Sequence, residues 1–120
     1  MFEVLALQPQ TVQAAEICEV LAHPAAYDGK LISISGIFRT DWHHGAIIIG
    51  EPCGWGIVFG GNANLGEPWT RIEGTRGHHD VKISIAVIGR FRWNPDDASM
   101  YPLKHVIAVD AITSLEIQPE

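Results

Sequence analysis

Two pairs of histidines are the residues whose chemistry most readily suggests a metal site. Imidazole nitrogens and carboxylates bind zinc and similar divalent ions, and both pairs fall in loops that flank expected strands. The candidate ligands are His43, His44, His78, His79 and Asp80. Adjacent residues at a strand end point to opposite faces, however, and no H-x-x-x-H or C-x-x-C spacing fixes a site in advance. Solvated loop histidines are therefore the favoured interpretation, and a metal-dependent protein is kept as an alternative.

The sequence contains no motif for covalent or phosphate chemistry. There is no G-x-S-x-G elbow, and the glycine-rich run from Gly60 to Asn64 lacks the Gly-Lys-Ser/Thr ending of a phosphate loop. Acidic residues are scattered through expected loops, so a two-carboxylate hydrolase site is not indicated. We therefore expect a protein that is not an enzyme and that needs no cofactor.

Cys18 and Cys53 are the only cysteines, so they can form at most one bridge, and neither belongs to a C-x-x-C pair. Two interpretations stay open, namely two core thiols or one disulfide. An exported protein would permit the second. Cys18–Cys53 is accordingly a candidate disulfide.

Tryptophan and arginine are the residue types that stack on bases and sugars in ligand grooves. The candidate ligand-binding residues are Trp42, Trp55, Trp69, Arg39, Arg90 and Arg92. The arginines are expected to point outward from strands, and the tryptophans lie at strand ends or in a long loop. The competing interpretation is that the tryptophans cap the core and the arginines pair with carboxylates. The sequence does not fix whether these six side chains share one face.

Composition limits the partners of the chain. The 120 residues are the usual size of one domain, and 47% hydrophobic residues are enough to build a core. The formal charge of −6 repels phosphate backbones, so a weak single-stranded nucleic-acid binder is only an alternative function. No apolar stretch has the length of a membrane-spanning helix. The leading hypothesis is a binding or interaction module for an unknown protein or small ligand, and the oligomeric state is left open.

Hydrophobic periodicity predicts one short helix followed by five strands. Apolar residues at three- and four-residue spacing indicate a helix from Ala14 to Ala22, which we expect Pro24 to end. The expected strands are Leu31–Arg39, Ala46–Gly50, Gly56–Phe59, Val81–Trp93 and Val106–Ile117, the last bending near Asp110 or Ala111. The segment Gly60–Asp80 is expected to be a long loop, in which Pro68–Glu73 could form a helical turn.

A weak internal repeat favours a barrel over a flat sheet. Residues 32–39 can be aligned with residues 85–92, so that Gly36 matches Gly89 and Phe38 matches Phe91. A strongly coiled strand needs a residue without a side chain where it bends around a small barrel. The predicted fold is therefore mainly β, a small five-stranded barrel of the oligonucleotide/oligosaccharide-binding (OB) type with a short N-terminal helix.

The segment from Cys18 to Gly36 resembles the opening of a group of uncharacterised bacterial OB-like proteins, many of them predicted to be exported or lipid-anchored. The shared pattern is a helix, a Pro-x-x-Tyr-x-Gly-Lys turn and an alternating strand that ends in glycine. It covers about the first third of the chain well and the later strands in outline. The resemblance implies the architecture and a periplasmic or exported location, and it transfers no catalytic residue.

The N-terminal segment has two interpretations within a single domain of residues 1–120. Thr11 to Ala15 reads like the polar end and small-residue cleavage site of a signal peptide, so residues 1–14 could be a remnant of one. Alternatively, Phe2, Val4, Leu5 and Leu7 form an arm or first strand that packs on the domain. The first interpretation fits an exported protein.

Overall fold

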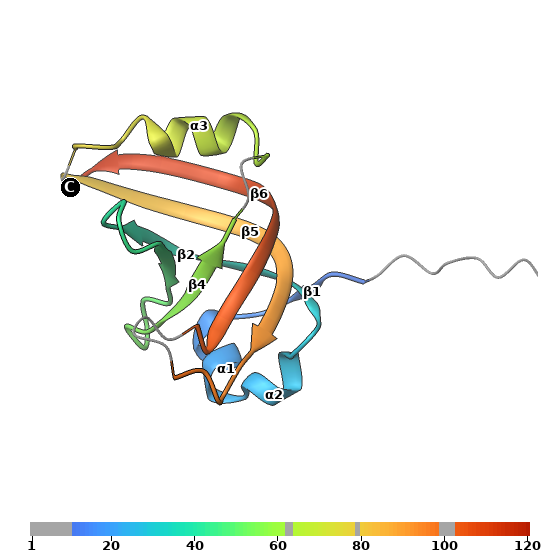
Figure 1. Cartoon of the computed structure of the whole chain (residues 1–120). Helices are drawn as coiled ribbons and strands as arrows, with labels where there is room; N and C mark the ends of the chain where they lie inside the picture. Colours follow the sequence, from blue (N-terminus) through green and yellow to red (C-terminus); the bar gives the residue numbers. More distant parts are fainter. Residues whose placement is uncertain (1–10, 62–63, 79, 99–102) are drawn as a thin grey trace, which may run out of the picture.

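The computed structural model describes residues 11–61, 64–78, 80–98 and 103–120, and the chain is mainly β (Figure 1). Within these ranges, three short helices accompany six strands. In chain order the elements are β1 (Gln13–Ala14), α1 (Ile17–Ala22), α2 (Pro24–Tyr27), β2 (Leu31–Thr40), β3 (Ala46–Ile49), β4 (Gly56–Gly60), α3 (Glu67–Glu73), β5 (Val81–Trp93) and β6 (His105–Pro119). Each of the five predicted strands is present, with ends within two residues of those expected.

The strands form one mixed sheet in the order β1-β2-β3-β4-β6-β5, with a further pairing between β2 and β5. The pairings are antiparallel except for two: β1 runs parallel to β2, and β4 runs parallel to β6. Following the pairings from β2 through β3, β4, β6 and β5 leads back to β2. One hydrophobic core packs against this sheet, and α1 and α3 lie near its opposite ends (Figure 1).

The core follows from strand periodicity. In β5 every second residue from Ile83 to Phe91 is buried, as a strand with one face toward the core requires. The buried residues contributed by the helices are Ile17 and Val20 from α1 and Ile72 from α3. Together with the inward residues of β2, β3, β4 and β6 they form one contiguous hydrophobic cluster.

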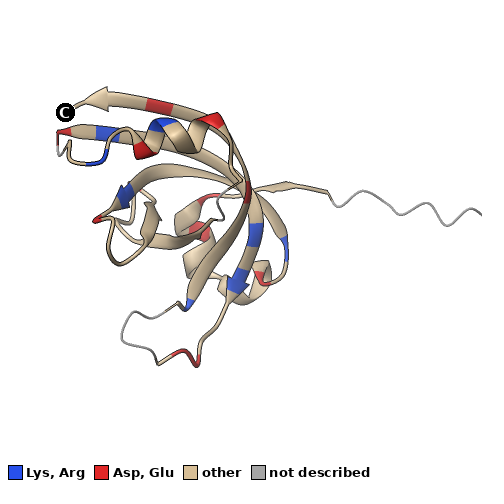
Figure 2. Ribbon diagram, turned by 45° about the horizontal axis from the view of Figure 1, so that its top comes forward, with Lys and Arg blue, Asp and Glu red and all other residues tan. Residues whose placement is uncertain are grey.

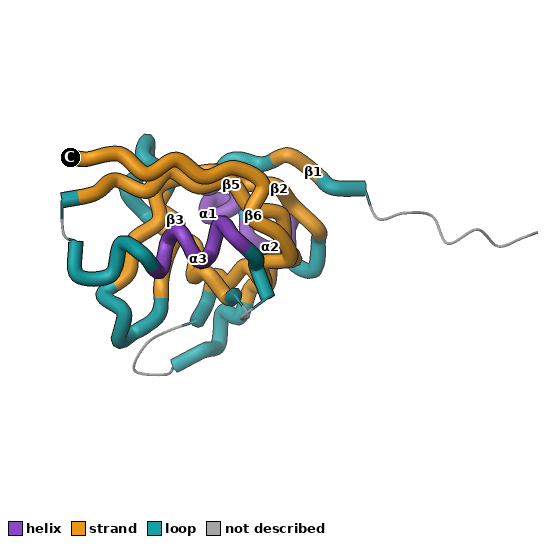
Figure 3. The backbone as a smooth tube through the Cα atoms, turned by 90° about the horizontal axis from the view of Figure 1, so that it is seen from above, coloured by secondary structure: helices purple, strands orange, loops and turns teal. Residues whose placement is uncertain are grey.

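The helices differ from the sequence prediction in their bounds. The helix expected from Ala14 begins only at Ile17, because Ala14 belongs to β1 and pairs with Ser33 of β2. Within the predicted long loop Gly60–Asp80, the helical turn expected at Pro68–Glu73 is present as α3, which spans seven residues and buries Ile72. The helix lies alongside β6 (Figure 3). Pro24 follows the end of α1, as expected, but it also begins α2, where its missing N–H leaves no helical hydrogen bond unmade.

The two matched glycines lie where the strands pass closest to other backbone. A Cβ at Gly89 would overlap the carbonyl oxygen of Ala108, and one at Gly36 would overlap the carbonyl oxygen of Ile49. The β5–β6 register shifts at two places, where Asp110 and Thr113 are each left without a partner in β5. The predicted bend at Asp110 is thus a β-bulge, which increases the local twist of the strand pair.

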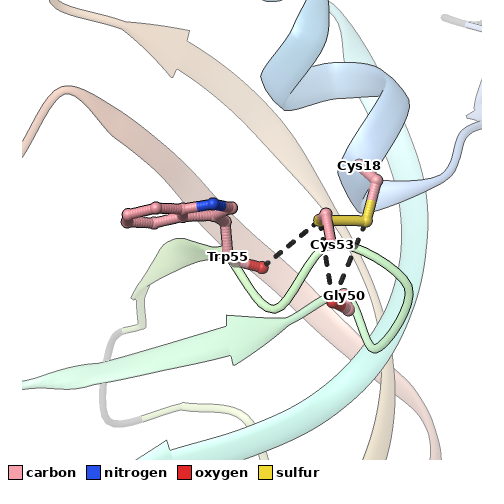
Figure 4. Close-up of a disulfide and its surroundings, with 4 residues drawn as sticks. All are labelled: Cys18, Gly50, Cys53 and Trp55. Carbon is pink, nitrogen blue, oxygen red and sulfur yellow. Dashed lines mark hydrogen bonds between the residues drawn. A yellow bond between two sulfur atoms is a disulfide. The ribbon is translucent and has the colours of Figure 1, made fainter.

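A disulfide joins Cys18 of α1 to Cys53 in the turn between β3 and β4, with 5.9 Å between the two Cα atoms (Figure 4). The candidate disulfide is therefore confirmed over two core thiols. At the N-terminal end, β1 pairs with Ile32 and Ser33 of β2. The arm predicted from Phe2, Val4, Leu5 and Leu7 lies outside the described residues. None of the helices in the described ranges is long and apolar enough to cross a membrane.

Candidate ligand pocket

The six predicted ligand-binding side chains lie at different ends of the sheet. Arg90 stands opposite Leu31, the first residue of β2, whereas Arg39 is eight residues further along the same strand, about 26 Å at 3.3 Å per residue. Trp42 and Trp69 lie at the Arg39 end, and Trp55 lies in the turn beyond the other end of β3. Basic residues are correspondingly spread over separate elements (Figure 2). The structure therefore groups three of the six, Arg39, Trp42 and Trp69.

Trp42 occupies a strained position in the loop between β2 and β3. Its φ is +66°, and it is the only non-glycine residue in the described part of the chain with a positive φ. Left-handed backbone costs an L-residue with a Cβ roughly 1–2 kcal/mol. Such strain persists only where the surroundings hold it, and it is concentrated at functional sites. The loop that holds Trp42 is therefore a candidate part of a functional site.

Two polar side chains fix this loop. The Trp42 N–H donates to the Thr40 hydroxyl (2.9 Å), which itself donates to the Gly45 carbonyl (2.7 Å). The Asp41 carboxylate accepts the backbone N–H groups of His43 (2.8 Å) and His44 (2.7 Å) and contacts the His44 ring nitrogen Nδ1 at 2.5 Å. These hydrogen bonds, with the His44 side chain as the largest contribution, hold the pKa of Asp41 well below its ordinary value. The loop is thus organised before any ligand arrives.

Trp69 joins the Trp42 loop to the core. Its ring stacks on Phe59 of β4, with centroids 5.6 Å apart and planes inclined by 11°, and its centroid is 6.3 Å from that of Trp42. Phe38 of β2 meets both Phe59 and Trp69 edge to face. Such aromatic pairs are stabilising beyond the area that they bury. Because α3 carries Trp69, the position of this helix sets one wall of the site.

A pocket of about 380 Å³ opens between the Trp42 loop, β4 and α3. Its lining residues are Thr40, Trp42, His43, Gly45, Ala46, Phe59, Gly61 and Trp69. None of them is Lys, Arg, Asp or Glu, and three are aromatic. An apolar pocket with a few polar groups at its edge is the usual form of a small-ligand site.

A second hollow of about 380 Å³ shares Thr40 and Trp42 with this pocket but is more polar. Arg39, Asp41 and His78 line it. Arg39 lies 3.8 Å from the Glu120 carboxylate, and the guanidinium of Arg76 lies 5.5 Å from the Trp42 ring centroid. Trp42 therefore stands between an uncharged compartment and a charged one.

The other three predicted residues lie elsewhere. Arg90 donates to the Gly29 carbonyl, and Arg92 is exposed two residues further along β5. Trp55 is 74% exposed, and its indole points away from the disulfide (Figure 4). A third hollow, of about 410 Å³, lies beside α1 and is lined by Ser35, Ser84, Ser114 and the glutamates Glu16, Glu51 and Glu116. It contains none of the six predicted ligand-binding residues.

The histidines do not form a metal site within the described ranges. No three His, Cys, Asp or Glu side chains there come close enough together to hold an ion. His43 lines the aromatic pocket and His78 the polar hollow, while Asp41 holds His44. Asp80 is exposed, and its carbonyl accepts the Glu120 N–H. His79 lies outside the described residues.

Sequence reasoning missed Phe59, Thr40 and Arg76 as members of the site. Thr40 and Asp41 ahead of Gly45 are typical of a turn in which side chains bind the backbone, so this signal was present in the sequence. Phe59 was recognised only as a strand residue. Arg76 and Trp42 are far apart in sequence, and no local pattern indicates their contact.

Comparisons with protein-family models, with curated proteins and with solved structures found no match.

Proposed function

We propose that this chain is a non-enzymatic binding module of the OB type, which holds a ring-bearing ligand in the pocket formed by Trp42, Phe59 and Trp69. The strand order supports the OB class. The five strands β2 to β6 pair in a cycle. Among them β4 and β6 run parallel, and α3 lies between β4 and β5 in the chain. This arrangement is the one expected of a small Greek-key barrel, and it therefore supports the proposed OB class.

The proposed binding function rests mainly on the strained backbone conformation of Trp42. Its left-handed backbone is held by Thr40 and by the loop that Asp41 organises, and its ring forms a wall of the pocket. Because the loop already holds the indole ring in place, less conformational entropy is lost when a ligand binds. Stacking on such a wall suits the flat apolar face of a sugar or another ring.

The charges favour an uncharged ligand over a polyanion. The pocket lining has no Lys, Arg, Asp or Glu side chain, and the whole chain carries a formal charge of −6. A phosphate backbone would need a continuous basic stripe, but Arg39 lies near one end of β2 and Arg90 of β5 pairs with the other end of that strand. We therefore place a neutral oligosaccharide ahead of a nucleic acid.

Isothermal titration with two probes tests this proposal. Maltohexaose represents a neutral ring ligand, and a twelve-residue oligothymidylate represents a single strand. We expect the neutral probe to bind with an affinity that does not depend on salt, and Trp42→Gly to abolish that binding. Binding of the oligothymidylate alone, weakening steeply with salt, would instead favour the nucleic-acid alternative.

Trp55→Ala is the matched control for this titration, because it removes a tryptophan from the opposite end of β3. It should leave the affinity for maltohexaose unchanged. Equal losses in Trp42→Gly and Trp55→Ala would place the binding outside the pocket and contradict the proposal.

We also propose that the protein works in an oxidising compartment. A disulfide between α1 and the β3–β4 turn supports this, since such bonds persist mainly in exported proteins. Trapping the thiols with an alkylating agent in intact cells should leave Cys18 and Cys53 unlabelled. Complete labelling of both would contradict an oxidising location.

A further inference from the structure

The polar hollow adjoins the aromatic pocket at Trp42. Each of the two has a volume of about 380 Å³, and Thr40 and Trp42 line both. Small-ligand sites span about 300–1,000 Å³, so each hollow is large enough to hold part of a ligand. A ligand that leaves the aromatic pocket over the edge of the Trp42 ring therefore enters the polar hollow.

The polar hollow combines an apolar base with side chains that form hydrogen bonds. Its most buried lining residues are Phe38 and Ile83, which are 3% and 6% exposed. Polar atoms are contributed by Arg39, Thr40, Asp41, Thr75 and His78. A sugar has the matching surface, because its ring carries apolar C–H groups on its faces and hydroxyl groups at its edge, each of which can donate and accept.

The backbone around the polar hollow is fixed by the hydrogen bonds of its own turns. The Thr75 hydroxyl donates to the Ile72 carbonyl (2.7 Å), and the His78 N–H donates to the Thr75 carbonyl (2.8 Å). In the Trp42 loop, the Asp41 carboxylate accepts two backbone N–H groups. Because both turns are already ordered, little conformational entropy is lost when a ligand binds between them.

The formal charges around the polar hollow cancel. Arg39 and Arg76 carry two positive charges, and Asp41 and Glu120 carry two negative ones. Arg39 lies 3.8 Å from Glu120, which is longer than a hydrogen bond, so this pair lowers the net charge without using a guanidinium N–H. Several hydrogen-bonding groups with no net charge favour a neutral polyhydroxy ligand over an ion.

We propose that the polar hollow is a second subsite and that the ligand is a neutral oligosaccharide of at least two rings. One ring stacks in the aromatic pocket, and the next passes over the edge of Trp42 into the polar hollow. There Arg39 donates hydrogen bonds to the sugar hydroxyls, and His78 forms one more. This inference rests on the proposed function, to which it adds a site and a minimum ligand length.

The affinity should accordingly depend on the number of rings. Glucose fills the aromatic pocket alone, whereas maltose fills both subsites and gains the hydrogen bonds of the second. In chemical-shift titrations, which also measure weak binding, maltose should bind about tenfold more tightly than glucose. The Trp42 indole N–H should shift with both sugars, and the ring protons of His78 with maltose only.

Two variants of the polar hollow separate the subsites. Arg39→Ala and His78→Ala should each lower the affinity for maltose about tenfold and leave the affinity for glucose unchanged. Glu120→Gln is the matched control, because it removes the charge beside Arg39 but lines neither hollow. Arg92→Ala removes an exposed arginine of β5 that lines neither hollow. Both controls should bind both sugars as the unaltered protein does.

Equal affinities for glucose and maltose would overturn the second subsite and leave the aromatic pocket standing. A gain from the second ring that survives in both Arg39→Ala and His78→Ala would also overturn it, because the second ring would then lie elsewhere. Equal losses for glucose and maltose in these variants would contradict separate subsites. If neither sugar nor maltohexaose binds, the ring-binding pocket itself is refuted.

Discussion

The guanidinium of Arg76 lies 5.5 Å from the centroid of the Trp42 ring, so the turn after α3 supports the loop before β3. A cation over an indole face stabilises by about 0.5–1 kcal/mol at an exposed site. Arg76 thereby limits the movement of Trp42 without itself lining the aromatic pocket. Arg76→Ala should weaken ligand binding modestly, whereas Arg76→Lys should retain most of the affinity. Equal affinities of all three proteins would show that the contact has no role in positioning Trp42.

The strain at Trp42 predicts an unusual order of stabilities. Replacing it with glycine removes the same ring as replacing it with alanine, but glycine accepts the φ of +66° and alanine does not. The relief is partly offset by the greater freedom of glycine in the unfolded chain. Trp42→Gly should therefore be more stable than Trp42→Ala by about 0.5–1 kcal/mol in urea unfolding. The opposite order would mean that the loop relaxes away from the left-handed conformation.

The disulfide should supply a large part of the stability of so small a domain. Cys18 and Cys53 are 35 residues apart, and closing a loop of that length restricts the unfolded chain by about 4 kcal/mol on the chain-entropy estimate. The double variant Cys18→Ala/Cys53→Ala should lose stability of that order in denaturant unfolding. Reducing the unaltered protein should produce a similar loss. A change below about 1 kcal/mol would show that the bond constrains little.

Gly89 should be the least replaceable glycine of the sheet. A Cβ there would overlap the backbone of Ala108, which cannot move without breaking the β5–β6 pairing. Gly89→Ala should cost about 3 kcal/mol or more in thermal or denaturant unfolding. Gly45→Ala is the matched control, because a Cβ at Gly45 meets nothing within 4 Å and the cost is only that of its positive φ, about 1–2 kcal/mol. Similar costs at both positions would contradict the close approach.

Acid should release the Trp42 loop only at low pH. Hydrogen bonds from His44 and His43 hold the pKa of Asp41 below its ordinary 3.8, so folding favours the ionised carboxylate. This contribution is fully present above pH 3.8 and disappears as the pH falls through the lower folded-state pKa. An NMR titration of the Asp41 carboxyl carbon should show no midpoint near 3.8. Asp41→Asn should remove this part of the acid sensitivity, and a midpoint at the ordinary value would contradict the network.

The sheet could be predicted from the sequence because its signals are local. Val81–Trp93 alternates strictly along its length, and the observed β5 has the same ends. Gly36 and Gly89 each lie two residues before a buried phenylalanine. They indicated coiling, because glycine weakens a flat strand and is common where a strand bends. The helix α3 was harder to recognise, since it has only seven residues and one fully buried side chain, Ile72, to mark its inner face.

The pocket could not be assembled from the sequence, because its contacts join residues that are far apart in the chain. Trp42 meets Trp69 only because α3 folds back over the end of β4, and no pattern in either segment encodes that approach. The separation of Arg39 from Arg90 likewise depends on the β2–β5 register. The sequence predicted the residue types of the site. The fold brings only three of the six predicted ligand-binding residues together, namely Arg39, Trp42 and Trp69.

The measurement that tests the ring-binding pocket most directly is a ¹H–¹⁵N spectrum of the four indole N–H groups during titration with maltohexaose. Trp42 and Trp69 should shift together and saturate with one affinity, while Trp55 and Trp93 stay in place. Shifts confined to Trp55 or Trp93, or no shift at any indole up to millimolar ligand, would contradict a ring-binding pocket at Trp42 and Trp69.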